Sequence, residues 1–238
     1  MNKSLIIIVA VLIALAVLGG VFLAYLFFQD SPKDNKETKK TKVSLEINEE
    51  KIEEETDDLI VSVRYPKTDN KKVNQEIDNL IESEINNFKE SIIDPIEELA
   101  SGIYISYIVS LNSPTILSII FDISIYPSGA AHPVSNTNVF NYDLDKEKRI
   151  DNKEIFTGNY LDVLSEICTE RLIEKIEPDE FMINSIYNGA SPTEENYEHI
   201  ALTKNGIIVI FEQYQVAAYA LGKQSIEILA SEISKVLK

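Results

Sequence analysis

The sequence of 238 residues contains a single cysteine and only two histidines. One cysteine cannot form a disulfide within the chain, and it excludes zinc sites that need several cysteines. Cys168 falls on the apolar face of a predicted helix, so we expect a buried, unreactive thiol. His132 and His199 have no second histidine at metal-ligand spacing. The sequence therefore predicts no metal site and no cofactor.

Motifs that mark common catalytic sites are also missing. The sequence has no G-x-S-x-G nucleophile turn and no glycine-rich phosphate loop before a helix. Its 39 acidic residues are so numerous that pairs of carboxylates are expected by chance. We therefore predict no catalytic residues. A cell-wall-modifying hydrolase that uses His132 with a nearby carboxylate as acid and base stays open as the alternative.

Positive charge is scarce, because 22 basic residues stand against the 39 acidic ones and give a formal net charge of −17. Such a surface repels nucleic acid and anionic lipid headgroups. It attracts cationic partners, whose association rate falls as salt is added. The hydrophobic content of 45% is sufficient for a folded core. The composition therefore argues against a nucleic-acid partner and favours a basic one.

The longest run without a charged residue covers residues 5–28. At about 1.5 Å per residue, a helix of this length extends roughly 36 Å and crosses a hydrocarbon core of about 30 Å. The run exceeds the apolar region of a secretory signal, about 7–15 residues, and no small-residue cleavage site follows it. It predicts an uncleaved transmembrane signal anchor, with a short cytoplasmic tail over residues 1–4 and a flexible linker over residues 29–42.

Lysines flank this run unevenly. Only Lys3 precedes it, whereas five lysines follow it in the linker. The positive-inside rule alone would place the following domain in the cytoplasm, but long C-terminal domains translocate largely regardless of flanking charge. We predict a single-pass protein of the cell membrane whose C-terminal domain is extracytoplasmic, with a cytoplasm-facing scaffold as the alternative.

Hydrophobic periodicity after residue 42 predicts one α+β domain. Strand patterns cover residues 43–47, 59–65, 103–111, 115–126, 134–144, 199–203, 206–211 and 225–228. Helical patterns cover residues 70–92, residues 159–176 and the C-terminal end up to residue 237. The acidic run over residues 49–58 is typical of a solvated loop. Because helices do not alternate with strands, we expect antiparallel sheets with helices packed on one face, preceded by one transmembrane helix.

Two segments stand out: the first joins small residues to a His-Pro pair, and the second mixes aromatic and small residues. The first, residues 128–133, contains Gly129, His132 and Pro133; the second, residues 211–222, contains Glu212, Tyr214, Tyr219 and Gly222. One interpretation is that both are tight connections that shape the ends of the sheets. The other is that they are neighbouring walls of a recognition surface, since tyrosine is favoured in binding sites. Both interpretations stay open, and these seven residues are the candidate binding residues.

The same segments carry a resemblance to known proteins. The loop GAAHP, the helix DNKEIFTGNYLDVLSEI and the stretch NGIIVIFEQYQVAAYALG resemble the extracytoplasmic domain of RsiV-like anti-sigma factors. The same module precedes the catalytic domain of PdaC-type peptidoglycan deacetylases, and residues 60–92 resemble the smaller module in front of it. The resemblance implies a PdaC/RsiV-type N-terminal module over residues 43–100 and an RsiV-like C-terminal module over residues 101–238.

The resemblance also implies a function. In RsiV-like proteins the domain faces outward and binds lysozyme, a basic protein. It implies here a non-catalytic binding module whose partner is lysozyme, another basic wall hydrolase or a cell-wall glycan. The deacetylase motif T-F/Y-D-D-G-P is missing, so deacetylation is not implied. Only residues 1–4 precede the uncharged run, so we expect no sigma-binding segment; a component of an envelope-stress sensor without that segment is a further alternative.

Overall fold

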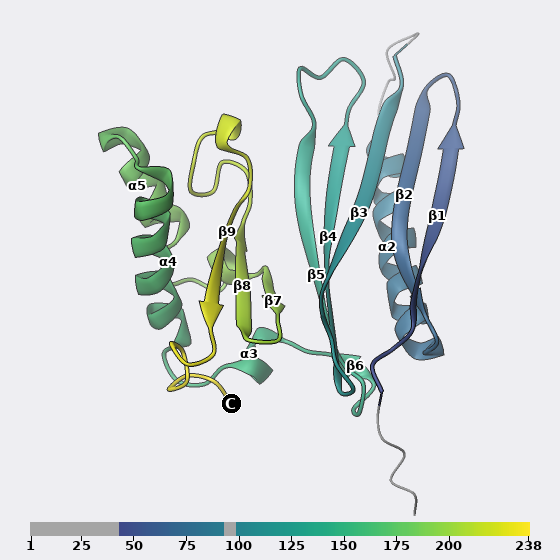
Figure 1. The fold of residues 1–238 in the computed structure, drawn as a ribbon. Coiled ribbons are helices and arrows are strands. Elements are labelled where there is room, and N and C mark those ends of the chain that lie inside the picture. Colours follow the sequence, from purple (N-terminus) through teal and green to yellow (C-terminus); the bar gives the residue numbers. More distant parts are fainter. Residues whose placement is uncertain (1–42, 93–98) are drawn as a thin grey trace, which may run out of the picture. The chain divides into compact units, whose positions relative to one another are not determined.

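The computed structural model describes residues 43–92 and 99–238 (Figure 1). The expected anchor over residues 5–28 and linker over residues 29–42 lie outside these ranges. Within the described ranges, none of the helices combines the length and the apolar character needed to cross a membrane.

Six strands form the first sheet, in which they are neighbours in the order of the sequence. The strands are β1 (Ile47–Glu55), β2 (Leu59–Thr68), β3 (Ser101–Asn112), β4 (Ile116–Tyr126), β5 (Val134–Asp143) and β6 (Lys148–Arg149). All neighbouring pairs are antiparallel except β2 and β3, which run parallel. Helix α2 (Lys71–Ser91) lies between these two strands in the chain, as a parallel pair requires a crossover connection.

The predicted fold class is therefore corrected. The protein is α+β, but its larger sheet is mixed rather than antiparallel, and the described part holds no membrane-spanning helix. The acidic run over residues 49–58 is also not a loop, because most of it belongs to strand β1. As an edge strand, β1 pairs only with β2, so its many exposed glutamates need no desolvation, and charge on an edge also opposes unwanted strand pairing.

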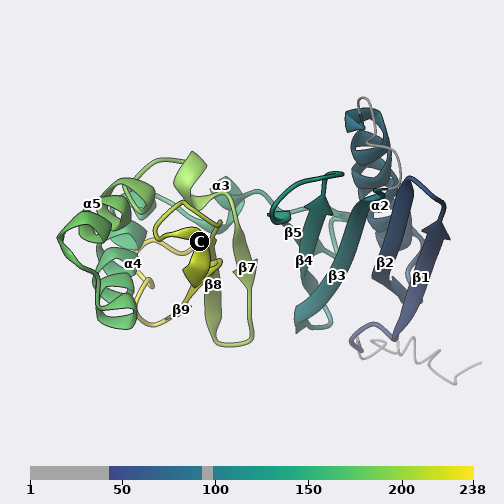
Figure 2. The same cartoon turned by 90° about the horizontal axis from the view of Figure 1, so that it is seen from above.

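Helix α2 covers one face of this sheet (Figures 1 and 2). Asn70 caps its first turn by accepting hydrogen bonds from the main-chain N–H groups of Lys72 and Val73. Its buried residues are Val73, Ile77, Ile81 and Phe88, spaced by four, four and seven residues. They pack into a core with alternate residues of strands β2 to β5, which is the face-by-face alternation expected of a half-covered sheet.

A second core lies in residues 155–237. Its elements are α3 (Asn152–Ile155), α4 (Tyr160–Ile176), α5 (Glu180–Gly189), the short 3-10 helices η1 (Glu195–Tyr197) and η2 (Tyr219–Leu221), and the antiparallel strands β7 (Ile200–Leu202), β8 (Gly206–Phe211) and β9 (Gln224–Leu229). Helix α4 packs beside β9 in both views (Figures 1 and 2). Cys168 of α4 is fully buried, and burial raises the pKa of its thiol to about 12, so the thiol stays protonated.

The predicted C-terminal helix is wrong. Residues 230–236 form turns, and Leu237 makes an isolated antiparallel bridge with Phe156. Ile233 and Val236 are nevertheless buried in the second core. Their spacing of three suits a helix, but consecutive turns bring the same side chains inward, and periodicity cannot separate the two.

Buried polar side chains join the two sheets. The Asn141 side chain of β5 donates to the carbonyl of Ile200 at 2.7 Å, and its oxygen accepts from the hydroxyl of Ser118 in β4 at 2.6 Å. The same hydroxyl accepts from the main-chain N–H of Leu202 at 3.0 Å. Strand β7 is thereby held against β4 and β5, which brings the loops at their ends together.

Candidate functional site

The two segments singled out from the sequence meet in space. The rings of His132 and Tyr219 lie 4.1 Å apart between centroids, and those of Tyr219 and Tyr214 lie 5.5 Å apart. The Tyr219 hydroxyl donates to the carbonyl of Pro133 at 3.3 Å. His132 is exposed, and Tyr214 is 63% exposed. These three rings are called here the aromatic surface; the exposed His132 and Tyr214 both contact the half-buried Tyr219.

Unusual backbone conformations shape both loops. Gly129 and Gly222 have φ of 74° and 66°, which glycine adopts without steric cost. Tyr214 has φ of 67°, a conformation that costs a residue with a Cβ roughly 1–2 kcal/mol. Gln215 secures this turn, because its side chain accepts from the N–H of Glu212 at 2.9 Å and donates to the carbonyls of Gly189 and Asn196. A strained tyrosine held outward in this way motivates a binding role.

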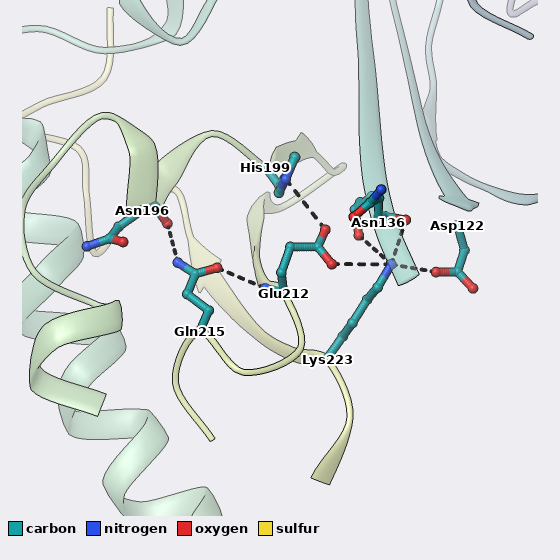
Figure 3. A network of polar contacts seen from close by, with 8 residues as sticks. Asp122, Asn136, Asn196, His199, Glu212, Gln215 and Lys223 are labelled. Atoms are coloured by element: carbon teal, nitrogen blue, oxygen red, sulfur yellow. Dashed lines mark hydrogen bonds and ion pairs between the residues drawn. The ribbon is translucent and has the colours of Figure 1, made fainter. Parts of the chain in front are cut away.

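Glu212 points into a polar network with His199 and Lys223 (Figure 3). Its carboxylate oxygens are buried and lack hydrogen bonds. They lie 3.5 Å from His199 Nε2 and 3.5 Å from Lys223 Nζ. Lys223 also reaches the first sheet, where its ammonium donates to the side chains of Asp122 at 2.6 Å and Thr137 at 2.9 Å and to the carbonyl of Asn136 at 2.7 Å.

The environment of His199 favours its neutral form. Burial lowers the pKa of the imidazole, and the Lys223 ammonium acts in the same direction, while the carboxylates of Glu212 and Glu198 oppose the shift. Glu212 is therefore held mainly by the positive charge of Lys223. Because two sheets contribute the groups, the network also ties the second core to strands β4 and β5.

Sequence reasoning selected Glu212 but missed His199 and Lys223 as its partners. A partial signal existed for His199. The Asn205-Gly206 pair predicts a hairpin, and the observed register sets the carbonyl of His199 against the N–H of Ile210, close to Glu212 along the chain. No local signal existed for Lys223, whose partner Asp122 is 101 residues away.

His132 does not have the surroundings that the hydrolase alternative requires. Its Nδ1 lies 3.1 Å from the carbonyl of Pro133, and within the described residues no carboxylate lies at salt-bridge distance from it. The described residues also contain no cluster of three or more histidine, cysteine or acidic residues able to hold a metal ion.

A polar cleft of about 560 Å³ lies beside the network. It is lined by Thr137, Asn138, Val139 and Asn141 of β5, by residues 149–153, by Tyr160, by Glu194, Glu195 and Glu198, and by His199 and Ile200. A volume of this size lies within the range of about 300–1,000 Å³ typical of small-molecule sites.

Two parts of the chain match known protein families. Residues 52–135 match the family described as deacetylase PdaC, and residues 153–231 match a family described as protein of unknown function DUF3298. The chain therefore combines a PdaC-like segment with a DUF3298 segment. The PdaC part of the expected resemblance is confirmed, and the RsiV part stays a prediction.

A curated relative and two solved structures add to this. The chain is 29% identical over 184 residues to the peptidoglycan-N-acetylmuramic acid deacetylase PdaC of Bacillus subtilis (strain 168); the match covers 74% of this chain but only 38% of that protein. A DUF3298 family structure from Bacteroides fragilis shares the fold with a TM-score of 0.60 and 19% identity, covering 83% of this chain and 95% of that one. One from Pseudomonas aeruginosa has a TM-score of 0.61 and 13% identity, covering 82% and 94%.

Proposed function

We propose that this chain is a non-catalytic, extracytoplasmic binding module that recognises a cell-wall glycan through the aromatic surface. The observation that carries the proposal is the convergence of His132, Tyr219 and Tyr214 from two distant loops into one cluster, in which His132 and Tyr214 are exposed. The relative that is named a peptidoglycan deacetylase supports the wall as the place of the ligand.

The chemistry of the rings suits a sugar. One face of a pyranose ring carries C–H groups and packs on the face of an aromatic ring, which is the negative part of the ring's quadrupole. Tyrosine adds a hydroxyl that bonds a polar ligand, and its few rotatable bonds keep the ordering cost low. Because Tyr219 is tilted by only 31° and 36° against its two neighbours, the rings form one cluster, and a sugar would contact its exposed members, His132 and Tyr214.

The variant Tyr214→Ala tests the aromatic surface. We expect it to weaken co-sedimentation of residues 43–238 with purified peptidoglycan about tenfold, the loss typical of one exposed aromatic anchor. Both hydrophobic cores lie within this fragment. Tyr187→Ala is a matched control, because Tyr187 is 56% exposed on helix α5. Equal binding by the two variants would remove the aromatic surface from the proposal.

The net charge of −17 favours a second candidate ligand, a basic wall hydrolase of the lysozyme type. Association between opposite charges is fast at low ionic strength and slows with salt. We expect immobilised residues 43–238 to retain hen lysozyme in low salt and to release it as sodium chloride is raised, measured by surface plasmon resonance. A lack of binding at low salt would rule out this partner.

A further inference from the structure

The polar cleft lies along the free edge of strand β5. The main-chain carbonyl of Asn141 accepts from Ile150, so the main-chain groups of Asn141 face away from β4. In an antiparallel pair this direction alternates along the strand, and the groups of Val139 and Thr137 therefore face the cleft as well. The carbonyl of Val139 is occupied, because Arg149 donates to it at 2.7 Å.

Arg149 brings a positive charge to this edge. Its guanidinium lies 4.4 Å from the ring centroid of Phe140, and this stacking together with the bond to Val139 fixes its position. Within the described residues no carboxylate lies at salt-bridge distance from it. A guanidinium has five N–H donors, so several stay free, and the outward N–H of Val139 lies next to them. Together these donors form a site that fits a carboxylate.

Unpaired negative charge comes from the segment around η1. Glu195 and Glu198 line the cleft, and among the described residues their side chains make no ion pair or hydrogen bond. The other charges of the cleft are engaged: Lys153 pairs with Glu194 at 2.9 Å, and Asp151 caps helix α3. Among the described residues the cleft thus offers one cation and two carboxylates that form no ion pair, although Glu76 acts electrostatically on Arg149 and Glu198 on His199.

From this distribution we infer that the cleft binds a small zwitterion, whose carboxylate bonds Arg149 and Val139 and whose ammonium group faces Glu198 and Glu195. The inference rests on the proposed wall-binding function for the source of that zwitterion. Two sources share the chemistry: muramic acid that has lost its acetyl group, and the end of a short wall peptide. The relative's printed name, an N-acetylmuramic acid deacetylase, makes the sugar the first choice, since removal of that acetyl group leaves an amine near the lactyl carboxylate.

A comparison of four sugars distinguishes the contribution of the carboxylate from that of the amine. Muramic acid carries both groups, N-acetylmuramic acid only the carboxylate, glucosamine only the amine, and N-acetylglucosamine neither. In NMR titrations of residues 43–238 we expect muramic acid to bind at least about tenfold more tightly than each of the other three. Equal affinity for all four, or no binding by any, would overturn the inference.

Variants assign each charge to its residue. Arg149→Met keeps the packing on Phe140 and is expected to abolish the preference for a carboxylate, so that muramic acid binds like glucosamine. Glu198→Gln is expected to abolish the preference for an amine. Lys235→Met and Glu227→Gln change the same charges at exposed positions outside the cleft and should leave all affinities unchanged. Loss of binding in these controls as well would contradict a local site.

A dipeptide identifies the source. If alanyl-alanine binds more tightly than muramic acid and depends on Arg149 and Glu198 in the same way, the zwitterion site stands and its ligand is a peptide. These tests of sugar and dipeptide binding at the cleft do not depend on whether the aromatic surface binds peptidoglycan. If unaltered residues 43–238 bind peptidoglycan but do not discriminate among the four sugars, this inference fails while the proposed wall-binding function stands. If Tyr214→Ala binds peptidoglycan like the unaltered fragment but muramic acid still binds the cleft, the aromatic surface fails while the zwitterion site stands.

Discussion

Replacing Lys223 by methionine is expected to lower the free energy of unfolding by about 2–4 kcal/mol. The ammonium of Lys223 is the strongest positive partner of the Glu212 carboxylate, whose oxygens are buried without hydrogen bonds. Removing one member of a buried ion pair leaves the other charge uncompensated, which typically costs about 3–5 kcal/mol. The side chains of Lys223 and Glu212 are 19% and 22% exposed, so solvent reduces that loss. Urea unfolding followed by circular dichroism measures it.

Two further variants separate charge from packing. The double variant Lys223→Met with Glu212→Gln removes the stranded charge and is expected to recover about half of the lost stability. Lys235→Met, at an exposed position where Lys235 forms no ion pair with the described residues, should change stability by less than about 0.5 kcal/mol. A stability of Lys223→Met equal to that of the wild type would show that the network does not hold the two sheets together.

The second large effect is expected for Gly189→Ala, at about 3 kcal/mol or more of lost stability. Gly189 ends helix α5 and is buried, and a Cβ built on it would lie 1.9 Å from the carbonyl oxygen of Gln215. Because that oxygen belongs to the backbone, the clash is relieved only by moving the turn that carries Tyr214. Peptidoglycan binding should therefore fall together with stability.

Gly158→Ala is the matched control for this substitution. Gly158 has φ of 60°, but a Cβ there would meet no atom within 4 Å. Only the conformational penalty of about 1–2 kcal/mol is expected, with normal binding to peptidoglycan. Thermal unfolding and co-sedimentation of both variants measure the difference. Similar losses in the two variants would contradict the close approach of α5 and the Gln215 turn.

Local patterns predicted several elements correctly. The apolar spacing from Val73 to Phe88 predicts helix α2, and the Asn205-Gly206 pair predicts the β7–β8 hairpin. In both cases the residues that carry the signal lie close together in the sequence. The two failures have different causes. Strand β1 pairs with its neighbour β2 across a short turn, but its acidic composition is typical of a solvated loop. The turns around Ile233 are held by core residues far away in sequence.

The candidate site shows the same division. The sequence indicated the loops of Gly129 and Tyr214 as candidate binding segments, because small and aromatic residues suit tight turns and exposed binding surfaces. The cleft gave no such signal. Arg149, Glu195 and Glu198 are ordinary charged residues in an acidic chain, and only their common position beside the edge of β5 distinguishes them.

The amino-acid sequence by itself determined that this protein has an α+β fold, carries a strongly acidic surface and includes a PdaC-like segment, because composition, periodicity and short motifs are local properties of the chain. The tertiary structure decided that β2 and β3 pair in parallel, that Lys223 is the partner of Glu212, and that Arg149 lines the same cleft as Glu195 and Glu198. These contacts join residues many positions apart, and the packing of the whole domain selects them among the many charged pairs that an acidic sequence allows.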